Sequence, residues 1–307
     1  MALSDSCITS YNLNEGSGTT ANDATGNENT GTIDGATFIA GKIGSHALRF
    51  DGVDDYLYTT TAYVNPQSYS LSLWFKTTNA SGKKLIGFES NRTGTSSAYD
   101  RHIYMGTDGK IKYGWWTGAQ TTISSTDTLN DGNWHHVVAT LQDGVGELFI
   151  DNVSQGTANG NAYNYSGYWR IGGGTNAWTS GASGSFDGDI DDVNIFNARL
   201  NESEVGLIYN NGNGLEHPFS PPYTILRSRS VYLNNTNVSR ATLQANTTSD
   251  NSNFVYALSN DGGTTFEEVN NNQIHTFTNS SGQEVQYQIW GKQLGSKINK
   301  IVVKINK

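Results

Sequence analysis

The sequence is poor in the residues that cross-link a chain or anchor it in a membrane. Cys7 is the only cysteine among the 307 residues, so no disulfide can form within the chain. No apolar run approaches the roughly 18–20 residues of a membrane-spanning helix, and the start lacks the basic and apolar regions of a secretory signal. The sequence therefore predicts neither membrane insertion nor a disulfide-based fold.

Charge is also scarce, and it is unevenly distributed. Charged residues make up 15% of the chain. Residues 1–221 hold 11 basic and 23 acidic residues, a formal charge of −12, whereas residues 222–307 hold 8 and 5, a formal charge of +3. Proteins that bind nucleic acid usually present a basic surface. The acidic larger part therefore argues against a nucleic-acid partner.

Glycine and aromatic residues are abundant instead. The chain has 35 glycines, only 4 prolines and 11% aromatic residues. This aromatic content argues against disorder, and glycine favours turns with positive φ. Apolar residues alternate with others in residues 69–77, where Leu71, Leu73 and Phe75 share one face, as expected for a strand. Similar stretches recur along the chain, so the sequence predicts an all-β fold.

Two local patterns give finer predictions. Residues 134–158 predict a three-stranded meander, with turns at Asp143-Gly144 and Asp151-Asn152. Residues 200–212 predict the one helix, with Asn201 as its N-cap and acidic residues in its first turn. A single short helix after many strands is typical of a cap on a β fold, and not of a βαβ crossover.

Several stretches carry a family resemblance. The stretch "DGNWHHVVATLQDGVGELFIDNV" resembles the W-H-H-V-A…L-Y-V-D-G hairpin of laminin-G-like, concanavalin A-like jelly rolls, and "FDGVDDYL", "SLSLWFK" and "GDIDDVNIFNARLNESEVGLIYNNG" resemble other segments of that pattern. The resemblance covers roughly residues 8–214 and implies two packed antiparallel sheets. The predicted domains are a jelly roll over 1–214, a proline-containing linker over 215–222, and a small immunoglobulin-like or fibronectin-like β domain over 223–307.

The adjacent histidines His135 and His136 raise the question of a metal site. Neighbouring residues on a strand point to opposite faces, so a single ion cannot easily bind both imidazoles. The sequence has no His-x-His spacing here. We therefore expect both histidines to be structural.

The side chains with oxygen ligands give a stronger indication of a metal site than the two histidines do, and the metal they favour is calcium. The loop 23–31 offers Asp23, Asn27 and Asn29. In the closing strand, Asp191 is in step with Val193 and Ile195, so we expect it to point to the same, apolar side. Calcium prefers six to eight oxygen ligands. The resemblance implies a structural calcium that ties these two regions together. The alternative is that the loop residues form Asx turns and that Asp191 accepts backbone hydrogen bonds. A second acidic cluster, Asp51, Asp54 and Asp55, is interpreted as a turn.

Aromatic residues crowd into the loops rich in glycine and asparagine. Exposed aromatic faces and amides are the groups expected at a carbohydrate site. The alternative is that these rings pack in the core. The candidates for ligand contact are Trp115, Trp116, Tyr165, Tyr168 and Trp178.

Catalytic motifs are missing from the strands. Glucanases of the concanavalin A-like fold carry E-x-D-x-E or E-x-D-x-x-E on one strand, and neither pattern occurs. A retaining glycosidase needs two carboxyl groups about 5–5.5 Å apart. The sequence therefore predicts a protein that is not an enzyme and has no catalytic residues.

The leading hypothesis for function is adhesion to a glycan or a host cell-surface component. The predicted setting is a virion surface, as a phage tail fibre or capsid decoration, or the extracellular space. The C-terminal domain is expected to attach to the larger assembly, and homo-oligomer formation is left open. The alternatives are a secreted carbohydrate-binding module of a larger polysaccharide-degrading enzyme and a structural virion protein without a ligand.

Overall fold

The chain divides into two compact units, Met1–Phe219 and Ser220–Lys307. The computed structural model describes residues 3–80, 83–175, 178 and 184–219 of the first unit. Of the second unit it describes 226–227, 231–232, 240–247, 254–259, 267–270, 273–277, 284–291 and 298–306. The first unit extends beyond the predicted domain end at 214, because Leu215 and Phe219 are buried against it.

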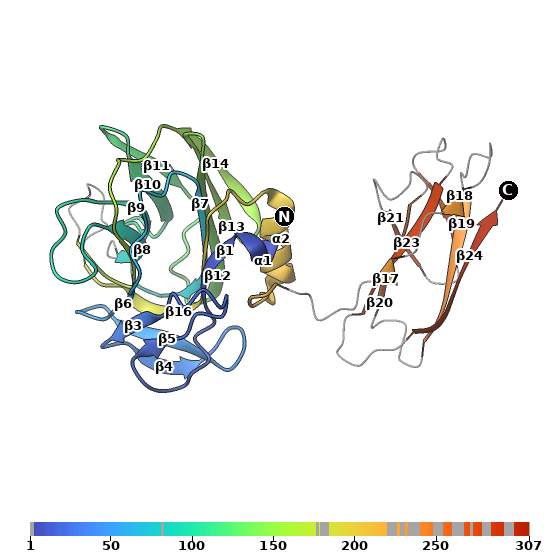
Figure 1. The fold of residues 1–307 in the computed structure, drawn as a ribbon, viewed down its shortest axis with the longest axis horizontal. Coiled ribbons are helices and arrows are strands. Elements are labelled where there is room, and N and C mark those ends of the chain that lie inside the picture. The colour runs from blue at the N-terminus through green and yellow to red at the C-terminus, as the bar shows by residue number, and fades with distance from the viewer. Residues whose placement is uncertain are drawn as a thin grey trace. The chain divides into compact units, whose positions relative to one another are not determined.

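The first unit is a sandwich of two antiparallel sheets (Figure 1). The first sheet has the order β14-β13-β12-β7-β16-β5-β4, and β1 also pairs with β16. Its strands are β1 (Cys7–Tyr11), β4 (Thr37–Ala40), β5 (His46–Asp51), β7 (Tyr69–Lys76), β12 (Trp134–Gln142), β13 (Val145–Ile150), β14 (Val153–Asn159) and β16 (Asp187–Phe196).

The second sheet has the order β11-β10-β9-β8-β15-β6-β3-β2. Its strands are β2 (Thr20–Ala21), β3 (Gly31–Asp34), β6 (Tyr56–Thr59), β8 (Lys83–Glu89), β9 (Tyr99–Met105), β10 (Ile111–Trp116), β11 (Gln120–Ser124) and β15 (Tyr168–Ile171). This arrangement confirms the predicted all-β jelly roll.

The core between the sheets follows the period-two pattern of the sequence. Leu71, Leu73 and Phe75 of β7 belong to the large apolar cluster between the sheets. Trp74, between them in sequence, stacks instead on Tyr209 outside the sheet, with ring centroids 5.8 Å apart. Alternation along the strand therefore divides the side chains between the core and the outer face.

The predicted meander is confirmed by β12, β13 and β14. Each strand pairs antiparallel with the next. Asp143 and Gly144 at the first turn, and Asp151 and Asn152 at the second, have positive φ values. Two consecutive residues with positive φ suit a tight hairpin, because that backbone follows the right-handed twist of the strands.

The predicted helix is also confirmed, as α2 (Glu202–Tyr209). Asn201 forms a capping box with Glu204, which satisfies backbone donors at the start of the helix. The helix ends at Asn210, which has a left-handed conformation, and η1 (Asn210–Gly212) follows. Val205 and Ile208 are buried in a second apolar cluster outside the first sheet, which also holds Val138, Phe149 and Phe196.

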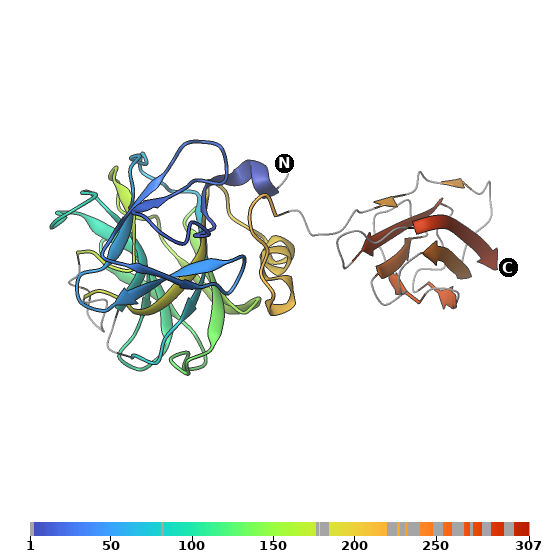
Figure 2. The ribbon, with the colours of Figure 1, turned by 90° about the horizontal axis from the view of Figure 1, so that it is seen from below.

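Figure 2 shows α2 and the short α1 (Leu3–Ser6) on the same side of the first unit. The helix α2 covers part of the outer face of the first sheet, because Val205 and Ile208 pack against Val138 and Phe149. No helix in the described part of the chain has the length and apolar character needed to span a membrane.

The described strands of the second unit form two antiparallel sheets. One has the order β17-β23-β20-β21 with β18 also on β23, and the other has the order β22-β19-β24. Buried side chains include Leu243 and Leu258. The immunoglobulin-like or fibronectin-like assignment stays a prediction. The strands are β17 (Leu226–Arg227), β18 (Val231–Tyr232), β19 (Arg240–Thr247), β20 (Phe254–Ser259), β21 (Glu267–Val269), β22 (Ile274–Thr276), β23 (Glu284–Gly291) and β24 (Ile298–Asn306).

Candidate functional site

Two neighbouring tryptophans at the end of β10 have opposite environments. Trp115 is 0% exposed, lies in the core cluster, and donates from Nε1 to the carbonyl oxygen of Gly160 at 2.7 Å. Trp116, the next residue along the strand, is 41% exposed. The predicted ligand role of Trp115 is therefore wrong, because its position on the strand turns the indole inward.

Two hollows meet at Trp116 and Tyr163, which line both of them. The first hollow has a volume of about 750 Å³, and its polar lining includes Asn65, Gln67, Asp143, Asn161 and Asn164. The second hollow has a volume of about 460 Å³, and its lining includes Tyr99, Asp100, Tyr165 and Trp178. Tyr163 is 56% exposed. The two exposed rings therefore stand where the hollows adjoin.

The structure brings three of the five candidate aromatic residues to these hollows. Trp116, Tyr165 and Trp178 line the second hollow, and Tyr165 is fixed by a hydrogen bond from its hydroxyl to the carbonyl oxygen of Phe88 at 2.7 Å. Tyr168 is half-buried on β15 and lines neither hollow. Tyr163, which was not among the five candidates, is the most exposed of these rings.

A buried ion pair holds the two exposed aromatic residues in place. Asp100 Oδ2 accepts from the backbone N–H groups of Trp116, at 3.2 Å, and Tyr163, at 3.4 Å. Arg101 donates from Nη2 to the carbonyl oxygen of Tyr163 at 2.8 Å and forms an ion pair with Asp100. Burial raises the pKa of the Asp100 carboxyl, and the Arg101 guanidinium opposes that rise.

The backbone at Arg101 has a positive φ of 55°. Such a conformation is uncommon for a residue with a side chain, and it is retained where the surroundings enforce it. The sequence offered only an Asp-Arg pair inside an otherwise ordinary strand, so the role of these two residues could not be recognised from it.

Amide side chains in the first hollow bind one another. Gln67 Nε2 donates to Asn65 Oδ1 at 2.9 Å and to Asn164 Oδ1 at 3.1 Å, and Asn65 Nδ2 donates to Asn164 Oδ1 at 3.2 Å. These bonds fix the orientation of the amides in advance of any ligand. A wall of fixed amides beside exposed aromatic rings can bind hydroxyl groups and apolar C–H faces together.

The predicted calcium ligands of the N-terminal loop bind β1 and the loop itself. Asp23 accepts from the backbone N–H of Ser10 through Oδ1 and from that of Asn29 through Oδ2, both at 3.0 Å. Asn27 and Asn29 each donate from Nδ2 to the carbonyl oxygen of Ile8, at 3.3 and 2.8 Å. The three loop residues therefore lie together beside β1.

Asp191 makes similar bonds to a different loop. Its Oδ2 accepts from the backbone N–H groups of Lys42 and Ile43, at 2.8 and 2.9 Å, and its Oδ1 accepts from that of Asp192 at 2.8 Å. Burial raises the pKa of Asp191 to about 7. Each oxygen of Asp23 and of Asp191 already accepts a backbone N–H, so a cation would have to compete with these donors. Calcium at these residues stays a prediction.

The side of the strand on which Asp191 lies was wrongly predicted. Asp191 pairs with Trp74, whose ring lies on the outer face, and Ile190 pairs with Phe75 of the core. The register shifts between Asp191 and Asn194, so the alternation that places Val193 in the core does not extend back to Asp191. A β-bulge of this kind changes the face of every residue before it.

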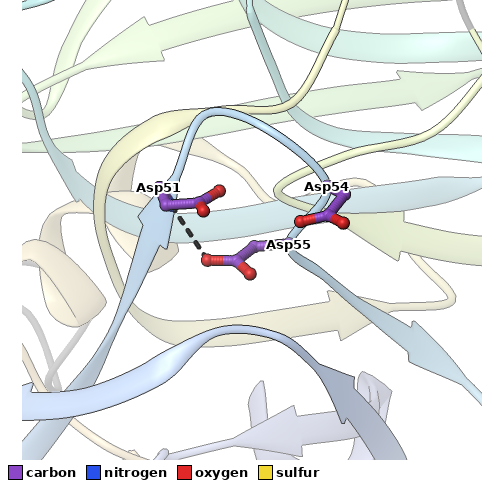
Figure 3. A group of neighbouring side chains, drawn as sticks. All are labelled: Asp51, Asp54 and Asp55. Atoms are coloured by element: carbon purple, nitrogen blue, oxygen red, sulfur yellow. Dashed lines mark hydrogen bonds between the residues drawn. The ribbon is translucent and has the colours of Figure 1, made fainter.

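The acidic cluster Asp51, Asp54 and Asp55 lies in the turn between β5 and β6 (Figure 3). Asp55 Oδ2 accepts from the backbone N–H of Asp51 at 2.9 Å, and Asp51 Oδ1 accepts from that of Val53 at 2.8 Å. These bonds shape the turn, in agreement with the interpretation from the sequence. We assign no cation to it.

The two histidines of β12 lie in separate environments. His136 is buried, contacts Ser72 Oγ through Nε2 at 2.8 Å, and packs on Trp74 with ring centroids 5.0 Å apart. Burial lowers the pKa of His136 to about 3. His135 binds Asp151 Oδ2 through Nδ1 at 2.7 Å, and this bond raises its pKa. The two imidazoles therefore bind different partners, and a structural role for both stays a prediction.

Comparison with known proteins shows the family to which this chain belongs. The sequence model of the concanavalin A-like lectin/glucanases superfamily matches residues 51–206, half of the chain. The chain belongs to this family. No curated protein sequence matches it significantly. Family membership agrees with the resemblance found in the sequence and with the two packed sheets.

Several solved structures resemble this chain at low sequence identity. A sialidase of Trypanosoma rangeli in complex with sialic acid has 15% identity and a TM-score of 0.52, covering 68% of this chain and 34% of that one. A mutant of the same sialidase displaying trans-sialidase activity has 14% identity and a TM-score of 0.52, covering 70% and 35%. Domain 4 of an extracellular GH43 arabinanase from Geobacillus stearothermophilus, in complex with arabinotriose, has 18% identity and a TM-score of 0.47, covering 68% and 98%.

These matches correct the prediction that the protein is not an enzyme. This chain spans about a third of the length of the sialidase chains. Part of each sialidase, which is a glycosidase, therefore has a similar fold. The prediction rested on one missing motif of paired carboxylates. Glycosidases use other arrangements too, including a tyrosine nucleophile in sialidases. The missing motif therefore gives no ground for excluding catalysis.

Proposed function

We propose that the first unit binds carbohydrate at the two hollows around Trp116 and Tyr163. The observation that carries this proposal is the pair of exposed rings, 41% and 56% exposed, held by one buried carboxylate between a hollow lined by amides and a hollow lined largely by aromatic side chains. An aromatic face covers the apolar C–H face of a sugar ring, and fixed amides bind its hydroxyl groups. A hollow with a few convergent polar groups is the usual form of a ligand site.

The relatives support the same class of ligand. The chain belongs to a family described as lectins and glucanases, and a sialidase that contains this fold has been solved in complex with sialic acid. That ligand is a property of the sialidase, of which this chain spans about a third. The support for carbohydrate binding by this chain comes from its own rings and amides.

Titration calorimetry with a panel of oligosaccharides tests the proposal. Trp116→Ala and Tyr163→Ala should each weaken the binding of any positive sugar by at least about tenfold, which corresponds to about 1.4 kcal/mol. Tyr58→Ala is the matched control, because this half-buried tyrosine of β6 lines neither hollow. Undiminished binding by the double variant Trp116→Ala/Tyr163→Ala would place the sugar elsewhere.

Adhesion at a virion surface or in the extracellular space is the setting that we propose for this activity. Attachment of residues 223–307 to a larger assembly and formation of a homo-oligomer stay predictions. The secreted carbohydrate-binding module and the structural virion protein remain the alternatives. Co-purification of the chain with virus particles, or its secretion in a larger polypeptide, would separate these settings.

A further inference from the structure

The two hollows contain acidic side chains but no basic ones among the lining residues that the structure describes. Asp143 lines the first hollow and Asp100 the second. The stretch 172–186, which carries Trp178, has no charged residue in the sequence. Arg101 compensates the charge of Asp100, whereas Asp143 is exposed. A sugar with a carboxylate or sulfate group would therefore meet the like charge of Asp143 and find no cation among the described lining residues.

Two residues with basic side chains lie behind this lining. His102 packs on Tyr99 and Trp178, and burial lowers its pKa well below the usual value, which favours the neutral imidazole. The protein itself uses the donors of the other, Arg101. The side chain is fully buried. Its Nε donates to the carbonyl oxygen of Pro66 at 3.0 Å, its Nη2 donates to that of Tyr163 at 2.8 Å, and its Nη1 pairs with Asp100. Arginine commonly recognises carboxylates through such donors. At this site the guanidinium already binds Pro66, Tyr163 and Asp100, so it is not available to a ligand.

The shared rings also bear on the length of the ligand. Because Trp116 and Tyr163 line both hollows, the hollows adjoin along these two side chains. A single sugar stacked on one ring leaves much of the combined space, about 750 and 460 Å³, to solvent. A chain of several sugar units lying across the rings reaches both hollows and contacts the amides of the first.

We infer that the site selects uncharged oligosaccharides bound along their length across Trp116 and Tyr163, and that it rejects sialylated, uronic-acid and sulfated sugars. This inference rests on the proposed function. Burying an anion without a partner is costly, and repulsion by Asp143 adds to that cost. The absence of a basic residue from the described lining thus acts as a specificity determinant, since discrimination arises as much from rejecting the wrong ligand as from binding the right one.

The experiment measures affinities of the full chain for matched pairs of sugars at low salt. The neutral probes are arabino-, xylo- and gluco-oligosaccharides from one to six units, lactose, and methyl-esterified oligogalacturonides. The acidic probes are sialyllactose and the free oligogalacturonides. We expect the best neutral oligosaccharide to bind at least about tenfold more tightly than its monosaccharide, and at least about tenfold more tightly than an acidic counterpart.

Two variants sharpen the test. Asp143→Lys should improve the binding of the acidic probes several-fold while the neutral oligosaccharides still bind. Arg92→Ala should change neither, because this exposed arginine lines neither hollow. Acidic probes that bind as tightly as the neutral ones would overturn this inference and leave the proposed function intact. Equal affinity for monosaccharides and oligosaccharides would overturn the extended mode of binding. If no sugar binds, the proposed function fails, and this inference fails with it.

Discussion

The outer faces of the two sheets of the first unit differ in how far the chain itself covers them. On the first sheet, α2 covers Val138 and Phe149 with Val205 and Ile208, and the face becomes a second apolar cluster. On the second sheet, the outward-facing Trp116 remains 41% exposed. A face that the chain covers itself is part of the core, whereas an aromatic face left open is available to a ligand.

Among the described residues, ion pairs with both side chains buried lie on the second sheet, although the first sheet also has buried carboxylates, such as Asp191. On the second sheet, Glu89 binds the fully buried Nζ of Lys84 at 2.6 Å and Nη1 of Arg170 at 3.0 Å. Asp100 and Arg101 form a second buried pair on β9. Buried pairs of this kind are weak sources of stability, but they fix geometry because breaking one leaves an uncompensated charge. We conclude that apolar packing maintains the covered face and that ion pairs shape the open one.

The largest effect is expected from breaking the ion-pair network of the second sheet. Glu89→Gln should lower the free energy of unfolding by about 3–5 kcal/mol, because it leaves Lys84 and Arg170 buried without their carboxylate. Denaturant unfolding measures the change. Glu147→Gln is the control: its ion pair with Arg199 is partly exposed, so its loss should cost about 1 kcal/mol or less. Equal losses for the two variants would contradict the comparison.

A somewhat smaller loss is expected from opening the covered face. Ile208→Ala should cost about 2–4 kcal/mol, because a buried side chain of α2 leaves a cavity over the first sheet. Sugar binding should stay unchanged in the same variant, since no residue of α2 lines either hollow. Leu207→Ala, on the exposed side of the helix, controls for helix propensity. A binding defect in Ile208→Ala would show that the two faces are coupled.

The pH dependence of stability separates the two histidines of the first sheet. Burial lowers the pKa of His136 to about 3, so the unfolded chain takes up a proton near pH 6.5 while the folded chain does not. His136 therefore costs stability as the pH falls from about 7 towards about 3. The stability difference between the wild type and His136→Gln should shrink over this range, as measured by denaturant unfolding at several pH values.

The contribution of His135 to stability should change with pH in the opposite direction. Its bond with Asp151 raises its pKa, so its contribution is fully present below about pH 6.5 and is lost as the pH rises through the folded pKa. The difference between the wild type and His135→Gln should therefore grow as the pH falls from 8 to 6. If both variants gave the same trend, the two environments described for the histidines would be wrong.

The sequence predicted features set by periodicity and turn chemistry better than those set by local departures from them. Alternation placed Leu71 and Phe75 in the core, and Asn201 marked the start of α2. The bulge after Asp191 and the positive φ of Arg101 leave no comparable pattern in a single sequence. For this reason the face of Asp191 was wrongly predicted, and the role of Arg101 was missed.

Aromatic residues show the same limit at the candidate site. Trp115 and Trp116 are adjacent and identical in type, and only the register of β10 decides which one is buried. The composition of this part of the chain predicted a ligand site, which stays a prediction. A shift of one residue in the strand register would exchange the buried and the exposed ring. The irregular glycine-rich loops on either side give no pattern from which this register can be predicted.

Removal of calcium should have the smallest effect, and it tests whether the covered face needs an ion. Asp191 lies on the α2 side of the first sheet, where three backbone N–H groups already bind its carboxylate. Asp23 is bound in the same way. A calcium ion shared by these residues would replace existing bonds, so its net stabilisation is small. We expect EDTA to lower the Tm by about 2 °C or less, corresponding to under about 1 kcal/mol, and added calcium to restore it. A fall of about 10 °C, absent in Asp23→Asn, would show instead that an ion, and not the backbone, holds the N-terminal loop to the closing strand.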